Sequence, residues 1–257
     1  MIDLHSHLLP GVDDGSRSGE QSAAVLEAFV EEGVEAVVLT PHVTASDINH
    51  HGADVLEQRA EVFEGLKAAL RRSPELHLGF EIMLDEPLSD RALDDRRYAL
   101  AESRYVLVEF PLGVSPDGVA ERLSAIAASG VVPLVAHPER YLRCTVHDLA
   151  TWRATGAKFQ LDAITLTRTN LRGHQARALL RAGLADVVAA DNHGSVNRTL
   201  GAAVRFLTER GHQHAARLLA AENPGAVIED RDLIEVGVVR VGSRVGDFVR
   251  RMVTIRR

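Results

Sequence analysis

The fold is decided by MIDLHSHLLPGVDDG at positions 1–15, where a short strand-like run leads into metal-competent side chains. Ile2–His7 reads as a strand because it is short, largely apolar and flanked by a loop sequence. Side chains alternate along a strand, so His5 and His7 project to the same side, at a spacing that lets both bind one metal ion. Asp13-Asp14-Gly15 follows in the next loop. The stretch therefore predicts a first strand that ends in metal ligands.

Strand-like runs alternate with amphipathic helical stretches over the rest of the chain. The strand candidates are Ile2–His7, Val34–Thr40, Leu76–Ile82, Tyr105–Phe110, Val131–His137, Lys158–Leu161 and Asp186–Ala190. The helical candidates are Glu20–Glu32, Ala53–Arg72, Asp117–Ser129, His147–Thr155, Gly173–Ala182 and Asn197–Glu209. This repeated order predicts parallel strands joined by crossover helices, in a barrel or a doubly wound sheet. Seven strand candidates suit a closed or nearly closed barrel.

We expect a single domain over residues 1–257, because neither a low-complexity linker nor an internal repeat interrupts the pattern. Its last part, residues 231–257, is expected to be a basic C-terminal extension. That part has seven Arg against Asp232, Glu235 and Asp247.

Metal-competent side chains recur at the C-terminal ends of these strands, where parallel α/β folds build their sites. Those that follow the first strand and its loop are His42, Glu81, Glu109, His137, Asp191 and His193. With His5, His7 and Asp14 they make five imidazoles and four carboxylates, enough for two or three ions. A nitrogen and oxygen ligand set without sulfur suits Mn, Fe, Zn or Mg. The sequence therefore predicts a multinuclear metal site.

Composition excludes several classes of protein. The 257 residues include 29 Lys and Arg against 36 Asp and Glu, and a net charge of −7 lacks the basic surface needed to coat nucleic acid. The chain has no run of 18 apolar residues and no signal-peptide pattern at its start, so we expect a cytoplasmic protein without membrane insertion. The lone Cys144 excludes an internal disulfide framework. Since Ala150 stands six residues later, the Cys-x5-Arg loop of thiolate phosphatases is absent.

Several motifs together carry a resemblance to a known family. They are HSHLLPGVDDG at 5–15, TPH at 40–42, Glu81, Glu109, HPER at 137–140 and Asp191-x-His193. They resemble the PHP (polymerase and histidinol phosphatase) superfamily, and more closely its bacterial manganese-dependent protein-tyrosine phosphatases associated with capsule and exopolysaccharide synthesis. The match runs in order from residue 1 to about residue 200. It implies a distorted (β/α)7 TIM-like barrel of the PHP type, with the metal site at the C-terminal ends of the strands.

The resemblance also implies a role for each site residue. The implied ligands are His5, His7 and Asp191 for a first ion, Glu109 and His137 for a second with Glu81 bridging the two, and Asp14, His42 and His193 for a third. Mn²⁺ is the implied metal, with Fe, Zn, Mg or Co as alternatives. Arg140 and Arg198 match family arginines that handle the phosphate.

The implied reaction is hydrolysis of phosphotyrosine by a metal-bound hydroxide, because coordination lowers the pKa of water toward ~7. The implied partner is a phosphotyrosine protein, namely the tail of a bacterial tyrosine kinase that regulates capsule synthesis. Nucleic acid is not an expected partner.

Three alternatives remain open on the sequence. One is a PHP phosphoesterase that acts on histidinol phosphate or a nucleotide. Another is an amidohydrolase, although the bridging carboxylated Lys of that class has no counterpart, since Lys67 lies in a helical stretch and Lys158 at a strand start. The third is a metal-stabilised binding module that docks a kinase tail without turnover.

Overall fold

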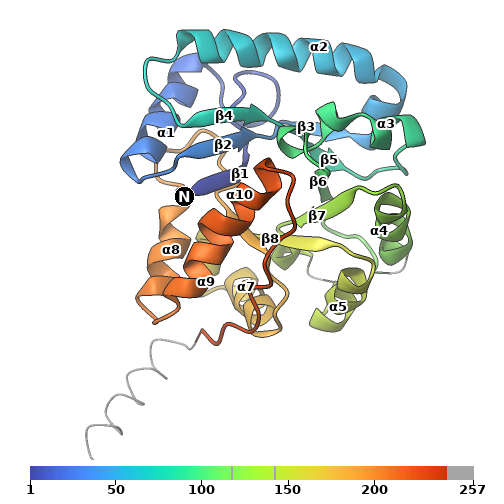
Figure 1. Cartoon of the computed structure of the whole chain (residues 1–257), viewed down its shortest axis with the longest axis vertical. Coiled ribbons are helices and arrows are strands. Elements are labelled where there is room, and N and C mark those ends of the chain that lie inside the picture. Colours follow the sequence, from blue (N-terminus) through green and yellow to red (C-terminus); the bar gives the residue numbers. More distant parts are fainter. Residues whose placement is uncertain (117, 142, 242–257) are drawn as a thin grey trace, which may run out of the picture.

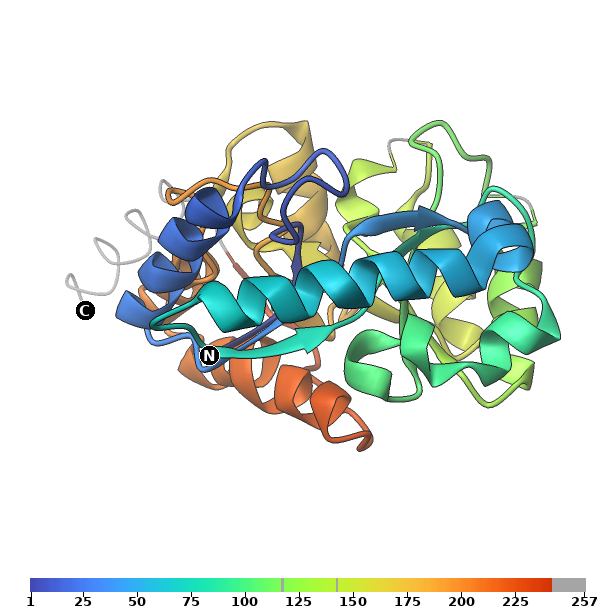
Figure 2. The ribbon, with the colours of Figure 1, turned by 90° about the horizontal axis from the view of Figure 1, so that it is seen from above.

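The computed structural model describes residues 1–116, 118–141 and 143–241, and shows short strands surrounded by helices (Figures 1 and 2). The strands are β1 (Ile2–Ser6), β2 (Ala36–Leu39), β3 (His42–Thr44), β4 (Glu75–Leu78), β5 (Glu81–Met83), β6 (Tyr105–Glu109), β7 (Val132–Ala136), β8 (Lys158–Asp162) and β9 (Val187–Ala189). The α-helices are α1 (Gly19–Glu31), α2 (Ala45–Ala69), α3 (Asp90–Asp94), α4 (Val119–Ala128), α5 (Val146–Ala154), α6 (Ala163–Thr167), α7 (Leu171–Arg181), α8 (Gly201–Thr208), α9 (Gln213–Arg217) and α10 (Asn223–Ile228). Single turns of 3₁₀-helix span Arg96–Tyr98, Leu100–Glu102 and Pro138–Arg140, and a π-helical turn spans Leu218–Glu222.

The strands form a distorted parallel barrel. They lie in two sheets, β1-β2-β4 and β3-β5-β6-β7-β8-β9, and every strand pair in them is parallel. Two residues separate β2 from β3, and two separate β4 from β5, so each of these pairs counts as one divided strand of the barrel. The nine strands therefore occupy seven positions. Main-chain bonds join the first position to the last, since Asp191 N donates to His5 O and His7 N donates to Asn192 O, both at 2.8 Å. The predicted α/β barrel is therefore confirmed.

Two breaks divide the strands, and only the second of them differs from the sequence prediction. Pro41 separates β2 from β3, because proline has no N–H to donate to a sheet. Gly79 separates β4 from β5, and a Cβ there would lie 3.0 Å from side-chain carbons of Val38 and Leu100. The prediction of one strand over Leu76–Ile82 is wrong for this reason, since β4 and β5 lie in different sheets.

Most predicted helices begin and end within a few residues of the observed ones. The exception is α2, which begins at Ala45 instead of the predicted Ala53. Thr44 caps this helix by accepting a bond from Asp47 N at 3.0 Å, and non-helical backbone at His51 divides it. The apolar periodicity becomes regular only after that kink. The predicted start of the next long helix, Asp117, lies outside the described residues, and α4 is described from Val119.

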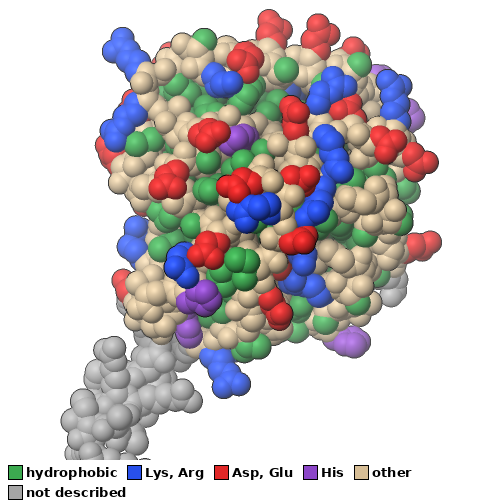
Figure 3. All heavy atoms as spheres, in the orientation of Figure 1, with side chains coloured by type: hydrophobic (Ala, Val, Ile, Leu, Met, Phe, Trp, Pro, Cys, Tyr) green, Lys and Arg blue, Asp and Glu red, His purple; other side chains and the backbone are tan. Residues whose placement is uncertain are grey.

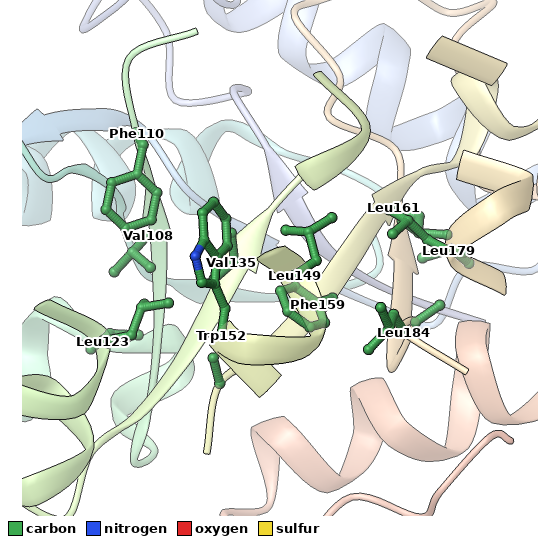
Figure 4. Close-up of a cluster of buried hydrophobic side chains, with 14 of the residues drawn as sticks. Val108, Phe110, Leu123, Val135, Leu149, Trp152, Phe159, Leu161, Leu179 and Leu184 are labelled. Carbon is green, nitrogen blue, oxygen red and sulfur yellow. The ribbon is translucent and has the colours of Figure 1, made fainter. Parts of the chain in front are cut away.

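Apolar packing between the strands and the outer helices makes the barrel wall stiff. Figure 4 shows Leu149 and Trp152 of α5 against Val135 of β7 and Phe159 of β8, and all four are at most 1% exposed. The ring of Trp152 also lies 5.8 Å from that of Phe110, just past β6. Truncating such a side chain to Ala typically costs about 3–5 kcal/mol of stability. This packing holds α5 against β6, β7 and β8.

Only the first part of the predicted C-terminal extension lies within the described residues. Tyr105 donates to the carbonyl of Arg231 at 2.7 Å, and Val239 N donates to Leu180 O at 2.9 Å, so residues 231–241 follow the barrel surface without regular structure. Residues 242–257 lie outside the described residues.

The helices and the surface can be compared with those of membrane-spanning and nucleic-acid-binding proteins. In the described part of the chain, the helices are too short or too polar to cross a membrane. The face shown in Figure 3 carries acidic and basic side chains side by side, instead of the continuous basic stripe of nucleic-acid-binding proteins.

Candidate metal centre

The two histidines of the first strand point at one position, as their spacing predicts. Nε2 of His5 and Nε2 of His7 lie 3.0 Å apart, and both side chains are fully buried. Nδ1 of His5 lies 3.0 Å from the amide oxygen of Gln160, and Nδ1 of His7 lies 2.8 Å from a carboxylate oxygen of Asp13. These contacts favour a proton on each Nδ1, so Nε2 is the ring atom that each histidine would offer to a cation.

Glu81, at the start of β5, lies at the middle of the cluster. Its Oε2 is 3.1 Å from His5 Nε2, 3.2 Å from His7 Nε2 and 3.2 Å from His42 Nδ1. Its Oε1 is 2.8 Å from His137 Nε2. Burial raises the pKa of Glu81, but the positive charges of His5 and His137 outweigh burial and hold the pKa well below its usual value. This carboxylate is therefore ionised and placed to bridge two cations.

The remaining predicted ligands complete the cluster. Asp14 Oδ1 lies 3.6 Å from His42 Nε2 and 3.5 Å from His193 Nε2. Asp191 Oδ1 lies 3.5 Å both from His5 Nε2 and from His193 Nδ1. Glu109, at the end of β6, places Oε1 3.3 Å from His42 Nδ1 and Oε2 3.9 Å from His137 Nε2. All nine side chains predicted from the sequence thus lie together.

Three sets of ligand atoms within this cluster are compact enough for one cation each. They are His5, His7 and Glu81; His42, Glu81 and Glu109; and His7, Asp14, His42 and His193. The third set contains the implied trio Asp14, His42 and His193 in full, with His7 added. The first set has Glu81 where Asp191 is implied, and the second has His42 where His137 is implied. His42 lies between the second and third sets, since its two ring nitrogens face different carboxylates.

The charges of the cluster suit bound cations. Glu81 Oε2 and Asp191 Oδ1 are buried and accept no hydrogen bond from the described residues, a costly state for a carboxylate. Burial lowers the pKa of His5, but Glu81 and Asp191 outweigh it and raise the value to about 9. The site thus favours positive charge at this point, which either protons or metal ions supply. The nitrogen and oxygen donors fit Mn, Fe, Zn or Mg.

Local backbone conformation also aims the ligands. His137 and Asp191 have φ angles of +32° and +46°, in the left-handed region that non-glycine residues rarely adopt. Gly15 has no such angle, but a Cβ there would lie 2.0 Å from the carbonyl oxygen of His7. The glycine of the DDG sequence thus lets the loop after β1 fold back over the histidines and place Asp14.

Two supporting residues were missed from the sequence. Asp13 accepts bonds from Gly15 N and His42 N, both at 3.0 Å, besides its contact with His7. Gln160 of β8 faces His5 and also accepts from His137 N at 3.3 Å. A buried amide in the strand KFQLD was the available signal for Gln160, and the second carboxylate of DDG was the signal for Asp13.

The two predicted arginines lie at the edge of the cluster, joined by an acid that the sequence did not single out. Arg140 donates through Nη2 to Asp191 and, at 3.2 Å, to Asp162. Arg198 donates through Nη2 to the same oxygen of Asp162 at 2.7 Å and lies 3.5 Å from Asp191. Asp162, at the end of β8, is 2% exposed. It thus holds both guanidinium groups beside Asp191.

Comparisons with known proteins give a matching family model and several named relatives. A family model described as "Capsular polysaccharide synthesis, CpsB/CapC" matches residues 1–229. Tyrosine-protein phosphatase YwqE of Bacillus subtilis is 25% identical over 242 residues, which cover 91% of this chain and 91% of YwqE. Tyrosine-protein phosphatase CpsB of Streptococcus pneumoniae is 28% identical over 249 residues, which cover 90% of this chain and 99% of CpsB.

Solved structures extend the comparison to the fold. One from work on YwqE and CpsB, called there unique metal-dependent tyrosine phosphatases, matches with a TM-score of 0.77 and 25% identity, covering 95% of this chain and 100% of the other. The lactonase Lmo2620 of Listeria monocytogenes matches with a TM-score of 0.56 and 12% identity over 90% of this chain and 95% of the other. That second likeness concerns the fold alone.

Proposed function

The chain belongs to the CpsB/CapC family of capsular polysaccharide synthesis, and we propose from this that it is a metal-dependent protein-tyrosine phosphatase. The observation that carries the proposal is the convergence of five histidines and four carboxylates, with two buried carboxylate oxygens left without a hydrogen-bond donor among the described residues. A barrel of this kind serves many reactions, so the site and not the fold supports the activity.

The proposed ligands are the nine clustered side chains. They are His5, His7, Asp14, His42, Glu81, Glu109, His137, Asp191 and His193. Mn²⁺ is the metal we propose, as two or three ions, of which two would share Glu81. When bound, such cations supply Lewis acidity toward phosphoryl oxygens and make water a nucleophile near neutral pH.

The arginines and the leaving group complete the proposed chemistry. Arg140 and Arg198 present guanidinium groups beside Asp191, and such groups bind phosphate oxygens in a fork and fix the orientation of the ester. A tyrosine phenolate has a pKa of ~10 and leaves without a strong general acid. The chain therefore needs only to bind the phosphate, orient it and hold its negative charge.

The proposed substrate is a phosphotyrosine protein, specifically the tail of a bacterial tyrosine kinase that regulates capsule or exopolysaccharide synthesis. The relatives support this choice, since YwqE and CpsB are named tyrosine-protein phosphatases and the family is described by capsular polysaccharide synthesis. The surface of this chain does not by itself identify the kinase.

A substrate panel tests the proposal. The purified protein is stripped with a chelator, reloaded with Mn²⁺, Fe²⁺, Zn²⁺, Mg²⁺ or Co²⁺, and assayed on phosphotyrosine peptides, phosphoserine peptides and histidinol phosphate. We expect the chelated protein to be inactive, Mn²⁺ to restore the highest rate, and phosphotyrosine to be preferred. Faster turnover of histidinol phosphate would instead identify a small-molecule phosphoesterase. Bound metal with no turnover of any phosphoester would identify a binding module.

A further inference from the structure

A hollow adjoins the candidate metal centre and is lined in part by the two arginines at its edge, Arg140 and Arg198. It has a volume of about 350 Å³. Its lining is Arg140, Asp162, Thr165, Arg168, Asn170, Leu171, Arg172 and Arg198. Four of these eight residues are arginines, and Asp162 is the single acid. Asp162 is already paired with Arg140 and Arg198, so the other two guanidinium groups face a hollow without a free carboxylate.

Within residues 1–116, 118–141 and 143–241, the side chains of Arg168 and Arg172 have no ion-pair or hydrogen-bond partner. Both residues are exposed, and among the described residues neither side chain makes an ion pair. Arg172 also lies in the first turn of α7, where the helix dipole disfavours a positive charge and where acidic residues are usual. The first turn of α7 contains no acid. Helix stability therefore does not explain this arginine.

The backbone that carries these two arginines is firmly held. The carbonyl of Arg168 accepts a bond from Nη1 of the buried Arg177 at 2.6 Å. Gly173 of α7 packs so closely on this carbonyl that a Cβ would lie 2.0 Å from the oxygen. Asn170 caps α7 by accepting from Gly173 N at 3.0 Å. The segment from Arg168 to Arg172 is thus a fixed wall of the hollow.

An exposed apolar side chain stands between the two arginines in sequence. Leu171 is 79% exposed, the highest value among the large apolar side chains that lie open on the described surface. Beside a phosphate site, an apolar contact flanked by positive charges suits an extended acidic peptide better than a free small anion. A peptide whose phosphotyrosine reaches Arg140 and Arg198 would pass its next residues over this wall.

We propose that Arg168 and Arg172 form a specificity subsite for acidic residues that flank the phosphotyrosine of the substrate. This inference rests on the proposed function and names the class of sequence that the phosphatase prefers. The flanking Asp or Glu carboxylates pair with the two free guanidinium groups, while Arg140 and Arg198 hold the phosphate. Charge-assisted contacts with arginine are the strong form of such recognition.

Matched peptides and matched variants test the subsite. Two phosphotyrosine peptides differ only in flanking Glu against Gln, and p-nitrophenyl phosphate reports turnover without flanking residues. For the unmodified, Mn²⁺-loaded protein we expect kcat/KM to be about tenfold higher for the Glu peptide at low salt, as two partly exposed charged contacts allow. The preference should shrink as salt is added.

The double variant R168Q/R172Q should lower the Glu-to-Gln preference to about twofold or less and leave turnover of p-nitrophenyl phosphate unchanged. The control R71Q/R72Q removes the same charge from exposed arginines at the end of α2 and should keep the preference. Equal loss in both variants, or a preference that survives R168Q/R172Q, would overturn the inference.

A measurement of peptide binding distinguishes a failure of this inference from a failure of the proposed activity. Fluorescence anisotropy with the two labelled phosphopeptides measures Kd without turnover. If the protein hydrolyses both peptides at equal kcat/KM, the phosphatase stands and the subsite is wrong. If it hydrolyses neither, the activity is wrong, and the Kd ratio of the peptides in the unmodified protein against R168Q/R172Q still decides the subsite.

Discussion

A carboxylate oxygen of Asp13 lies 2.8 Å from Nδ1 of His7, and the opposite ring nitrogen of His7 faces the ligand cluster. This contact sets which nitrogen of His7 carries the proton. The same carboxylate accepts from the backbone of His42, so it ties the loop after β1 to the start of β3. Asp13 therefore positions two of the proposed ligands, His7 and His42, without being one of the predicted nine.

Replacing Asp13 by Asn should weaken metal binding more than it weakens the fold. We expect a loss of about 10–100-fold in metal affinity, the usual effect of removing such a partner. The measurement is activity as a function of Mn²⁺ concentration, in which the variant should approach the normal rate at high metal. A variant with unchanged metal dependence would show that the contact does not tune the ligand.

Replacing Glu81 by Gln should remove the bridging charge of the cluster. The amide matches the carboxylate in shape but cannot balance two cations, so we expect at least one ion per chain to be lost. Elemental analysis of the purified variant measures that loss, and phosphotyrosine turnover should fall by about 100-fold or more, since each ~1.4 kcal/mol of lost stabilisation costs tenfold. A circular dichroism spectrum checks the fold. Full metal content in a folded variant would contradict the bridging role.

Replacing Asp162 by Asn should separate the arginines from the metals. Asn keeps the capping oxygen that accepts from Ile164 N and Thr165 N, but loses the charge that holds Arg140 and Arg198. We expect metal content to stay normal and kcat/KM to fall by about tenfold, with KM affected at least as much as kcat because phosphate binding is lost. The variant T165V, which removes one uncharged donor to Asp162 and leaves both ion pairs, is the control.

Thiol reagents should leave the activity intact. Cys144 is 4% exposed, and burial raises the pKa of its thiol to about 11. Because the thiolate is the reactive form, alkylation should be negligible at pH 7 to 8 and should rise only as the pH approaches that value. Iodoacetamide treatment followed by a phosphotyrosine assay measures this, with the variant C144S as control. Inactivation by alkylation at pH 7 that C144S prevents would point to a thiolate mechanism instead.

The ligand positions could be predicted from the sequence because they depend on local geometry. A period of two puts His5 and His7 on one side of a strand, and parallel strands bring their C-terminal ends to one edge whatever their order. The break at Gly79 could not be read in this way. A strand with a glycine and an apolar flank has the same pattern whether it is straight or divided. Only the tertiary structure shows that β4 and β5 lie in different sheets and that a side chain at Gly79 would crowd Val38 and Leu100.

Spacing along the chain was enough to predict parallel strands with crossover helices, the nine side chains of the cluster and the absence of a thiolate loop. It left a barrel and a doubly wound sheet open, and the family resemblance implied the barrel. Only the tertiary structure decided which residues support the nine side chains. Asp13 and Gln160 matter because of the ring nitrogens they face, and Asp162 because two arginines from distant segments meet on its carboxylate. Arg168 and Arg172 became informative only when the fold placed them on the same hollow as Arg140 and Arg198 without acids to neutralise them. Pairing and charge balance are relations in space, and they have no period along the chain.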